Sequence, residues 1–526
     1  MDGTSVIERQ AGRPAETGHP APDRNPQRRD GTPRILARLW ADEAANGLVR
    51  RSPEHSARER GFSHLIALAG FLVPAALTGL ALKGPGILGL LALTLSPVFA
   101  AQTLLRLAAA LLAPRWAPKR DLPVRALPAA SLIVALYREA AVLDQLIAAL
   151  KAIDYPRDRL EIKLALETGD TRTREALASI ALDERFEVVL VPPGRPQTKP
   201  RALNHALRFC TGEIVGVLDA EDRPHPRQLR CAAESFSLAP AELVCLQAPL
   251  NWFNRAESWL TRQFALEYAA HFHGLLPLYN RLGWPLPLGG TSNYFRTAAL
   301  RRAGAWDAWN VTEDADLGVR LHRMGLRCGL IAPMTLEEAP VGLAAWIPQR
   351  TRWLKGYLQT LAVHAAAGRK PGRRLLSLGL TLGGAILSAL ACGPSVVIVL
   401  AAILLTGGTA GLPVLAGLTG TGWLAAALCA WRAACRAGVP VRTGDLLTLP
   451  VYEAIKFWPA VRALYQLVTN PYHWEKTEHG VSALSKPSPC ISPSPPRSSR
   501  SASSSRSSSS PAGAPASRSV RNAARE

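Results

Sequence analysis

The chain has 526 residues, a formal net charge of +21, and a hydrophobic content of 48% that is gathered into long blocks between polar stretches. This alternation is typical of a multi-pass membrane protein that carries a polar domain. Many arginines flank the apolar blocks, so the positive-inside rule accounts for the basic surplus and no nucleic-acid partner is predicted. The eight cysteines show no CxxC spacing, which predicts neither a zinc site nor a disulfide framework.

The N-terminal part divides into a polar segment and an apolar pair. Residues 1–60 are rich in Pro, Arg, Asp and Gly, and a disordered or loosely structured region without a secretory signal is predicted. The apolar blocks His64–Leu82 and Ile87–Ala113 are each long enough to cross about 30 Å of hydrocarbon. Because basic residues flank the pair on both sides, a transmembrane hairpin over residues 61–114 with cytoplasmic ends is expected.

From about residue 125 to 320, short apolar strands alternate with helices, which predicts a parallel, doubly wound sheet. In such sheets ligands bind beyond the carboxyl ends of the strands. The predicted elements in this region are a helix at Ala140–Lys151 and strands at Ala130–Leu136, Leu160–Leu166, Phe186–Val191 and Glu213–Leu218.

Polar side chains follow the first two predicted strands. Tyr137 and Glu139 come after the first, and Glu167 and Asp170 come at the end of the second. A carboxylate there can accept hydrogen bonds from a ligand, although a solvated loop acid is the alternative. Lys199 begins a helix, where a cation is unfavourable for the helix dipole unless an anion is bound; a plain surface lysine is the alternative.

A later strand ends in three carboxylates within four positions, Asp219, Glu221 and Asp222. Clustered carboxylates stay ionised only with cations nearby, and hard oxygen ligands suit Mg²⁺ or Mn²⁺. Because acids before a proline are also common in loops, the spacing alone leaves both interpretations open.

Two further stretches carry polar groups at turns and helix starts. A Gly-rich turn contains Gly290, Thr291 and Ser292, where a ligand can approach the backbone closely. Thr312 precedes Glu313 and Asp314 at a predicted helix start. Asp314 is a candidate general base, while helix capping by Thr312 is an alternative that can hold at the same time.

The tract QRTRW, residues 349–353, is expected to open a basic, aromatic helix. Arg350 and Arg352 are too close in sequence to share one helix face, so only one of them needs to bind a ligand. The alternative is a helix anchored on anionic headgroups.

Apolar blocks return in the C-terminal part. Leu375–Leu405 contains a Gly-Pro pair and is predicted as one kinked span or two short ones, and Leu412–Trp431 as a further span. Leu447–Val468 contains three charged residues, and a charge at mid-bilayer costs roughly 2.5–3.5 kcal/mol, so this segment is predicted to be interfacial or to face a channel. Residues 481–526 are Ser, Pro and Arg repeats, which predicts a disordered basic tail.

The motifs and their order resemble those of the processive family-2 glycosyltransferases, which include the cellulose, hyaluronan and poly-N-acetylglucosamine synthases. The resemblance rests on TED at residues 312–314 and QRTRW at residues 349–353, together with KPRALN at residues 199–204 and DAE at residues 219–221. WEKTEHG at residues 474–480 is similar to tails of the related biofilm-polysaccharide synthases and suits a loop that closes over the donor. Two departures stand out: the family usually has two adjacent acids where this chain has Gly169 and Asp170, and an Asp where it has Glu221.

The resemblance implies a role for each site residue. Donor binding would involve Tyr137, Glu139, Glu167, Asp170, Lys199, Asp219, Gln349 and Arg352. Acceptor binding would involve Gly290, Thr291, Ser292 and Trp353. The catalytic group would be Thr312, Glu313 and Asp314, with Asp314 as the base. The metal, Mg²⁺ or Mn²⁺, would be held by Asp219 together with Glu221 or Asp222.

The implied protein is a multi-pass inner-membrane, inverting glycosyltransferase with a cytosolic GT-A-like, Rossmann-like α/β domain inserted between transmembrane helical segments. It would use a nucleotide-sugar donor, most simply a UDP-sugar, to build a β-linked polysaccharide in contact with membrane lipid, with an accessory export subunit as a further partner. The alternatives are non-processive transfer to a lipid carrier, an inactive membrane scaffold, and a transporter without chemistry. The expected divisions are 1–60, 61–114 (hairpin), 115–345 (glycosyltransferase domain), 346–374 (interfacial helix), 375–468 (transmembrane and interfacial helices), 469–480 (cytosolic loop) and 481–526 (tail).

Overall fold

The computed structural model describes residues 34–58, 85–114, 121–365, 371–406, 412–476, 480–482 and 484. All of them lie within the first of two units of the chain, residues 1–486. The first predicted membrane block, His64–Leu82, and nearly all of the predicted tail lie outside the described residues.

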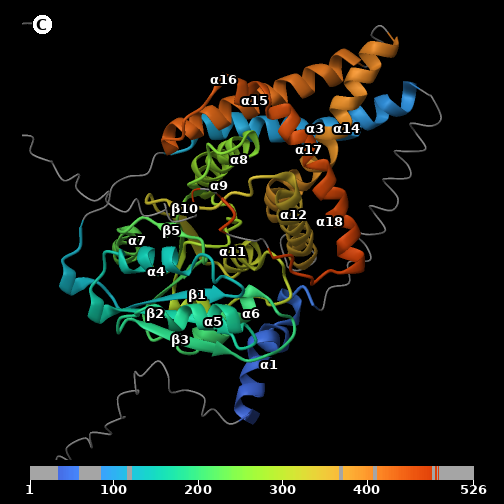
Figure 1. Ribbon diagram of the computed structural model, residues 1–526. Coiled ribbons are helices and arrows are strands. Elements are labelled where there is room, and N and C mark those ends of the chain that lie inside the picture. The colour runs from blue at the N-terminus through green and yellow to red at the C-terminus, as the bar shows by residue number, and fades with distance from the viewer. Residues whose placement is uncertain are drawn as a thin grey trace, which may run out of the picture. The chain divides into compact units, whose positions relative to one another are not determined.

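A seven-stranded sheet with the order β3-β2-β1-β4-β8-β6-β9 carries the polar strand ends. Figure 1 shows its strands β1, β2 and β3 side by side. Its strands are β1 (Ala130–Leu136), β2 (Leu160–Glu167), β3 (Phe186–Val191), β4 (Ile214–Leu218), β6 (Leu243–Gln247), β8 (Asn293–Arg296) and β9 (Arg327–Leu330). The predicted strands match β1 and β3 and differ from β2 and β4 by one residue. Strands β1 and β4 are short runs of apolar residues that are buried on both faces.

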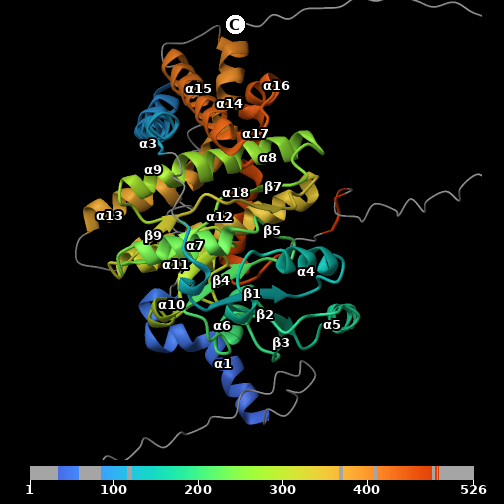
Figure 2. The same cartoon turned by 90° about the vertical axis from the view of Figure 1, so that its left-hand side faces the viewer.

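Helices cover both faces of this sheet. Leu132 and Val134 of β1 pack in one core with α4 and α7, whereas Ile133 packs in a second core with α6. Figure 2 shows α4 and α6 on opposite sides of β1 and β2. The helices around the sheet are α4 (Leu143–Lys151), α5 (Thr171–Ala178), α6 (Lys199–Leu207), α7 (Gln228–Leu238), α10 (Thr297–Arg302) and α11 (Glu313–Arg323).

The prediction of a wholly parallel sheet is wrong, because β8 runs antiparallel to both β4 and β6. The chain reaches β8 only after passing through α8 (Trp259–Ala270), a π-helical turn at His271–Leu275, and α9 (Leu276–Arg281). Hydrophobic patterning identifies a strand but carries no information about its direction. The fold is therefore α/β with a mixed sheet.

A small second sheet, in the order β5-β10-β7, lies next to the acidic end of β4. Its strands are β5 (Arg223–Pro224), β10 (Thr335–Glu337) and β7 (Leu250–Trp252). Because β5 directly follows Asp222 and β10 pairs with it, the last residue of β10, Glu337, is brought toward the acidic strand end.

Helices from both chain ends gather on one side of the sheet. These are α3 (Pro85–Leu112), α12 (Leu343–Ala365), α13 (Pro371–Leu378), α14 (Gly384–Thr406), α15 (Leu412–Ala437), α16 (Thr443–Leu447), α17 (Leu449–Ile455) and α18 (Phe457–Thr469). Helix α15 packs along α3 and α8, α14 packs against α17, and α12 packs against α18. Figure 2 shows α3, α14 and α15 together above α8.

One helical stretch among the described residues, Leu375–Val396, is long and apolar enough to cross a membrane, and Phe99–Leu112 is apolar but shorter. The block predicted as one or two spans is a single helical run: α13 leads through a π-helical turn at Gly379–Gly383 into α14, which continues past Pro394.

Helix α12 differs from its expectation, because QRTRW does not open it. The helix begins at Leu343, and QRTRW follows the internal Pro348. Trp346 is fully buried in the main core, so its packing holds the first turn in place ahead of the proline.

The prediction of little regular structure in residues 1–60 is wrong for part of that range, because α1 (Arg34–Arg51) is a helix packed on α6. A buried stripe that includes Ala41, Ala44 and Leu48 faces the domain. The stripe could not be recognised in the sequence, because alanine contributes little to an apolar pattern and the surrounding residues are mostly polar.

Candidate active site

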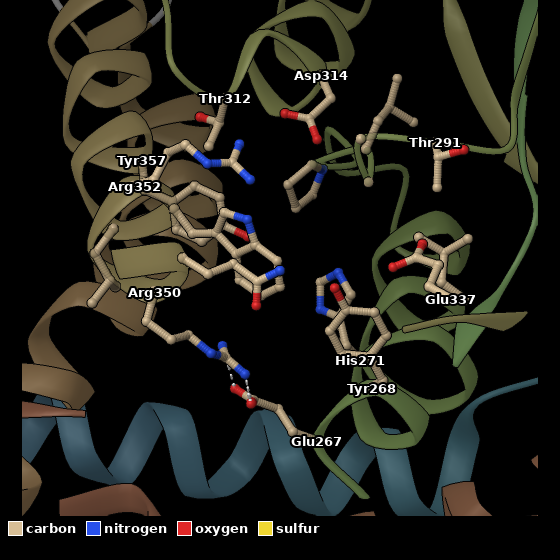
Figure 3. A pocket seen from close by; sticks show the side chains of 18 of the residues that line it. Glu267, Tyr268, His271, Thr291, Thr312, Asp314, Glu337, Arg350, Arg352 and Tyr357 are labelled. Carbon is tan, nitrogen blue, oxygen red and sulfur yellow. Dashed lines mark hydrogen bonds and ion pairs between the residues drawn. The ribbon is translucent and has the colours of Figure 1, made fainter. Parts of the chain in front are cut away.

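A cavity of about 420 Å³ opens at the carboxyl ends of β1, β2 and β4 and continues to the helices on the far side of α12. Figure 3 shows its walls, with Asp314 and Thr291 toward one end and the Arg350–Glu267 pair toward the other, next to α3. Among the predicted site residues, those that line it are Tyr137, Glu139, Glu167, Lys199, Asp219, Glu221, Gly290, Thr291, Thr312, Glu313, Asp314, Gln349, Arg352 and Trp353. The wall does not include Asp170, Asp222 or Ser292.

Of the three carboxylates that follow β4, two line the cavity and one is buried in the core. Asp219 and Glu221 line the cavity, while Asp222 is fully buried and accepts hydrogen bonds from the backbone N–H of Asp219, at 2.8 Å, and the hydroxyl of Thr291. Burial, and next the charge of Asp219, raise the pKa of Glu221 to about 8. Burial with the charges of Asp219 and Glu221 also raises the pKa of Asp222.

Glu337, at the end of β10, joins this acidic group and was not found from the sequence. It lines the cavity, and its Oε1 is a buried oxygen with no hydrogen-bond partner among the described residues, as is Oδ1 of Asp222. Burial raises its pKa well above the usual range, and the charges of Asp222, Glu221 and Asp219 add to that rise. Glu337 lies more than a hundred residues from the motif, and the only signal in the sequence is an acid at the end of a short apolar run.

The donor set of this end suits a divalent cation. The described chain leaves carboxylate oxygens unpartnered here, and burial together with neighbouring carboxylates raises the pKa values of Glu221 and Glu337, so positive charge would be stabilising. No three Asp, Glu, His or Cys side chains in the described chain converge closely enough to share one ion. A site with Asp219 and Glu221 as its protein ligands is compatible with this, because Mg²⁺ is usually held by one or two carboxylates, with water and substrate phosphates completing the shell.

Lys199 supplies positive charge at the same end. Its ammonium pairs with Asp219 and donates a hydrogen bond to the carbonyl of Gly290 at 2.7 Å. Burial alone would lower the pKa of Lys199, but the charges of Asp219 and Glu313 outweigh burial and raise it. The lysine is therefore a permanent cation on the cavity wall.

Asp314 is placed to take a proton in the cavity. Its Oδ1 accepts a hydrogen bond from the backbone N–H of Ala315 at 2.8 Å, and its Oδ2 lies 3.4 Å from the position of a β-carbon on Gly290. Glycine at 290 therefore leaves the space in front of this oxygen open. Burial raises the pKa of Asp314 to about 6, and burial followed by the charge of Asp314 raises the pKa of Glu313 to about 8.

Thr312 holds this motif against α12 rather than capping α11. It sits at the N-cap position, but its side chain makes no capping hydrogen bond among the described residues, and its hydroxyl contacts Asn310 at 3.4 Å. A β-carbon on Gly356 of α12 would lie 2.7 Å from the β-carbon of Thr312. The two helices thus touch at a glycine, which brings TED and QRTRW together.

Both arginines of QRTRW line the cavity, but they contact different groups. Arg352 lies in the cavity wall with its guanidinium 4.4 Å from the ring centroid of Trp474, and its Nε has no hydrogen-bond partner. Arg350 turns the other way and donates to Glu267 at 3.0 Å. Trp353 also lies in the wall, with its ring centroid 4.7 Å from the guanidinium of Arg350 and 6.0 Å from the ring centroid of Tyr268.

Two of the predicted donor-side acids have structural partners. Glu167 accepts two hydrogen bonds of 2.8 Å from Arg201 while still lining the cavity. Asp170 caps α5 through the backbone N–H of Thr173, at 3.2 Å, and accepts from the N–H of Arg138, whose φ is 58°. Asp170 therefore braces the turn after β1 from outside the cavity.

The C-terminal segment returns to this end of the cavity. Trp474 and Lys476 line it, and Lys476 forms an ion pair with Glu139 at 2.7 Å. Glu475 faces the opposite way and accepts a hydrogen bond from Arg462 at 2.6 Å.

Ser292, which the resemblance assigns to the acceptor turn, is buried, and its hydroxyl forms a hydrogen bond of 2.6 Å with that of Thr335.

Comparisons with known proteins give the family that the central part of the chain matches. Residues 128–356 match the family model described as Glycosyltransferase like family 2. The chain is 30% identical over 237 residues to Beta-monoglucosyldiacylglycerol synthase of Synechocystis sp., which covers 44% of this chain and 48% of that protein. It is 24% identical over 261 residues to Cellulose synthase 1 catalytic subunit [UDP-forming] of Komagataeibacter xylinus, which covers 48% of this chain and 34% of that one.

The chain thus spans about half the length, or less, of these two relatives. Its fold is similar to that of a mannosyltransferase from Pyrobaculum calidifontis, solved in complex with GDP-Man and Mn²⁺, with a TM-score of 0.50 and 21% identity over 72% of this chain and 98% of that one. The chain therefore carries a glycosyltransferase family 2 domain of GT-A-like fold in residues 128–356.

Proposed function

We propose that the chain is an inverting, metal-dependent glycosyltransferase that moves a sugar from a nucleotide-sugar donor, most simply a UDP-sugar, to the hydroxyl of an acceptor. One observation carries the proposal: a carboxylate free to take a proton, Asp314, lies in the same cavity as the acidic strand end and Lys199. Relatives and structural neighbours with nucleotide sugars or Mn²⁺ in their names support the donor and the metal.

In this reaction Asp314 accepts the proton of the acceptor hydroxyl, and that oxygen attacks the anomeric carbon from the face opposite the nucleotide. The bond from the anomeric carbon to the diphosphate oxygen breaks, and the nucleoside diphosphate leaves with the electron pair. Lys199 and Arg352 supply fixed positive charge beside the leaving group. A Mg²⁺ or Mn²⁺ ion held by Asp219 and Glu221 would add further charge against the diphosphate when bound.

The acceptor would enter from the helix side of the cavity. The cavity wall continues past Trp353 to Leu382, Ser388 and Ala389, which belong to the candidate membrane span Leu375–Val396. A lipid acceptor fits this route, and the glycolipid synthase among the relatives supports it. The apolar span and the interfacial helices support placement at the inner membrane, with the nucleotide end in the cytosol.

Formation of a β-linked polysaccharide is the second candidate. Tyr268, Phe272, Trp353 and Tyr357 line the middle of the cavity, and aromatic rings of this kind can stack on successive sugars. The cellulose synthase among the relatives supports it. In this case an accessory export subunit would receive the product.

The proposal is tested by incubating the detergent-solubilised protein with a panel of labelled nucleotide sugars, with and without excess chelator. We expect one or a few donors to be consumed, with Mg²⁺ or Mn²⁺ restoring activity after chelation. A product with one sugar on a lipid selects the first acceptor, and a long glycan selects the second. Full turnover in excess chelator would contradict the metal-dependent reaction.

A further inference from the structure

At the helix end of the cavity, five charged side chains form a row in which the signs alternate. Arg350 pairs with Glu267, Glu267 with Lys456 at 2.7 Å, Lys456 with Glu453 at 2.7 Å, and Glu453 with Arg106 at 3.8 Å. We call these five residues the ion row. All five line the cavity, and they come from α3, α8, α12 and the end of α17. Figure 3 shows the Arg350–Glu267 end of the row.

The ion row has three cations and two carboxylates, which leaves one positive charge in excess. The carboxylate of Glu267 is already paired with Arg350 and Lys456, and Tyr452 also donates a hydrogen bond to it at 2.6 Å. Arg106 at the end of the row is the least satisfied member. Within the described chain its only ion-pair contact is the long one to Glu453, and its guanidinium makes no hydrogen bond there. A guanidinium in an apolar helix bundle with unused donors is costly unless an acceptor is bound.

Arg106 also lies between two neighbouring cavities. A second, smaller cavity of about 60 Å³ lies between α3, α14, α15 and α17, and Arg106, Glu453 and Ser388 line both. Ser388 belongs to the candidate membrane span Leu375–Val396. An anion bound by Arg106 would therefore lie where the reaction cavity meets the apolar helices.

We propose that the ion row binds one anionic group of the acceptor, and that the acceptor is a lipid whose headgroup carries a phosphate ester. This inference rests on the proposed transferase function and deepens it, because it replaces an unspecified lipid with an anionic one. The phosphate would occupy the unused donors of Arg106, and the row would carry no excess charge. The hydroxyl that accepts the sugar would then extend from the phosphate toward Asp314.

The test uses the full chain in neutral detergent micelles. Phosphatidylglycerol, which has one phosphodiester and free hydroxyls, is compared with diacylglycerol of the same acyl chains and with inorganic phosphate. Native mass spectrometry reports lipid affinity without turnover, and binding of UDP to the same samples reports the donor end. We expect phosphatidylglycerol to bind at least about tenfold more tightly than diacylglycerol.

Substitutions in the ion row test whether its charge determines the affinity for the lipid. Arg106→Gln is expected to weaken phosphatidylglycerol binding about tenfold and to leave diacylglycerol binding unchanged, whereas Glu453→Gln, which adds to the excess charge, is expected to strengthen it. Arg432→Gln is the matched control, because it removes an exposed cation from α15 away from both cavities. All three variants should bind UDP as the native chain does.

Equal affinity for the two lipids, or an equal effect of the Arg106 and Arg432 variants, would overturn the proposal. If inorganic phosphate binds as tightly as phosphatidylglycerol, the site is one for a free anion, and the lipid part of the proposal is overturned. Selective lipid binding without sugar transfer would contradict the transferase function and leave the site standing, while sugar transfer without lipid selectivity would contradict only this inference.

Discussion

The two ends of the active-site cavity handle charge in opposite ways. At the nucleotide end, seven carboxylates against three cations line the wall, and several of those carboxyls have raised pKa values. At the helix end, the five members of the ion row pair with one another and one cation is left over. In the proposed reaction a metal ion would supply the positive charge that the first end lacks, and an acceptor would supply the negative charge that the second end lacks. Ligand classes can thus be inferred from what each end lacks.

The largest expected effect comes from removing the base. Asp314→Asn keeps the size of the side chain and its hydrogen bond to Ala315 but cannot take the proton, so kcat should fall about 10²–10⁴-fold. Donor affinity and melting temperature should hardly change. Turnover and donor binding are measured on the same purified sample, and a variant that keeps most of its turnover would remove Asp314 from this role.

The next effect concerns the metal ligand. Asp219→Asn should weaken nucleotide binding in the presence of Mn²⁺ by about 10–100-fold, because one of the two ligands on the cavity wall is lost. Asp170→Asn is the matched control: Asp170 lies outside the cavity and caps α5, and asparagine caps about as well. Donor titrations of both variants check this, and equal losses would place Asp170 in the site after all.

A smaller effect is expected where TED meets QRTRW. Gly356→Ala places a β-carbon 2.7 Å from that of Thr312, so α11 or α12 must shift. We expect about a tenfold loss of kcat through misplacement of Asp314 and Arg352. Gly342→Ala, at the start of α12, meets nothing within 4 Å and should have native kinetics. If both variants show native rates, the close contact has no part in positioning the site.

The smallest expected effect is on stability, and it tests whether the acidic end of the cavity is short of positive charge. Because burial and like charges raise the pKa of Glu337 in the folded chain, the folded state disfavours its ionised form, which lowers stability at pH values above its unfolded pKa. Glu337→Gln removes that charge, so the metal-free melting temperature near pH 7 should rise by about 2 °C, while stabilisation by Mn²⁺ should decrease. A lower melting temperature without metal would contradict the charge shortage at this end.

Local patterns predicted much of this arrangement. Strand ends such as Asp219 and helix starts such as Lys199 could be placed because the alternation of strands and helices fixes where a parallel strand ends. Glu337 could not be found, since it belongs to a separate small sheet and reaches the acidic end of β4 only through the pairing of β10 with β5. Asp170 and Ser292 illustrate the opposite error, because a polar residue beside a motif can serve the fold instead of the ligand.

The helix end was even less accessible to sequence reasoning. The charges of Glu453 and Lys456 predicted an interfacial or channel-facing segment, but the ion pair of Lys456 with Glu267 joins residues that are far apart in the chain. The antiparallel β8 and the helix α1 were missed for related reasons, since neither strand direction nor an alanine-rich packing stripe leaves a strong hydrophobic pattern.

The pH dependence of turnover, compared between the native chain and Asp314→Asn, tests the central claim most directly. With the pKa of Asp314 raised to about 6, the carboxyl is protonated and inactive below that pH, so the native kcat/KM should rise with pH through about 6 and then level off. The variant should be slow at every pH and lack that rising limb. A variant that keeps both the rate and the limb would show that another group takes the proton, and the assignment of this end of the cavity to catalysis by Asp314 would be wrong.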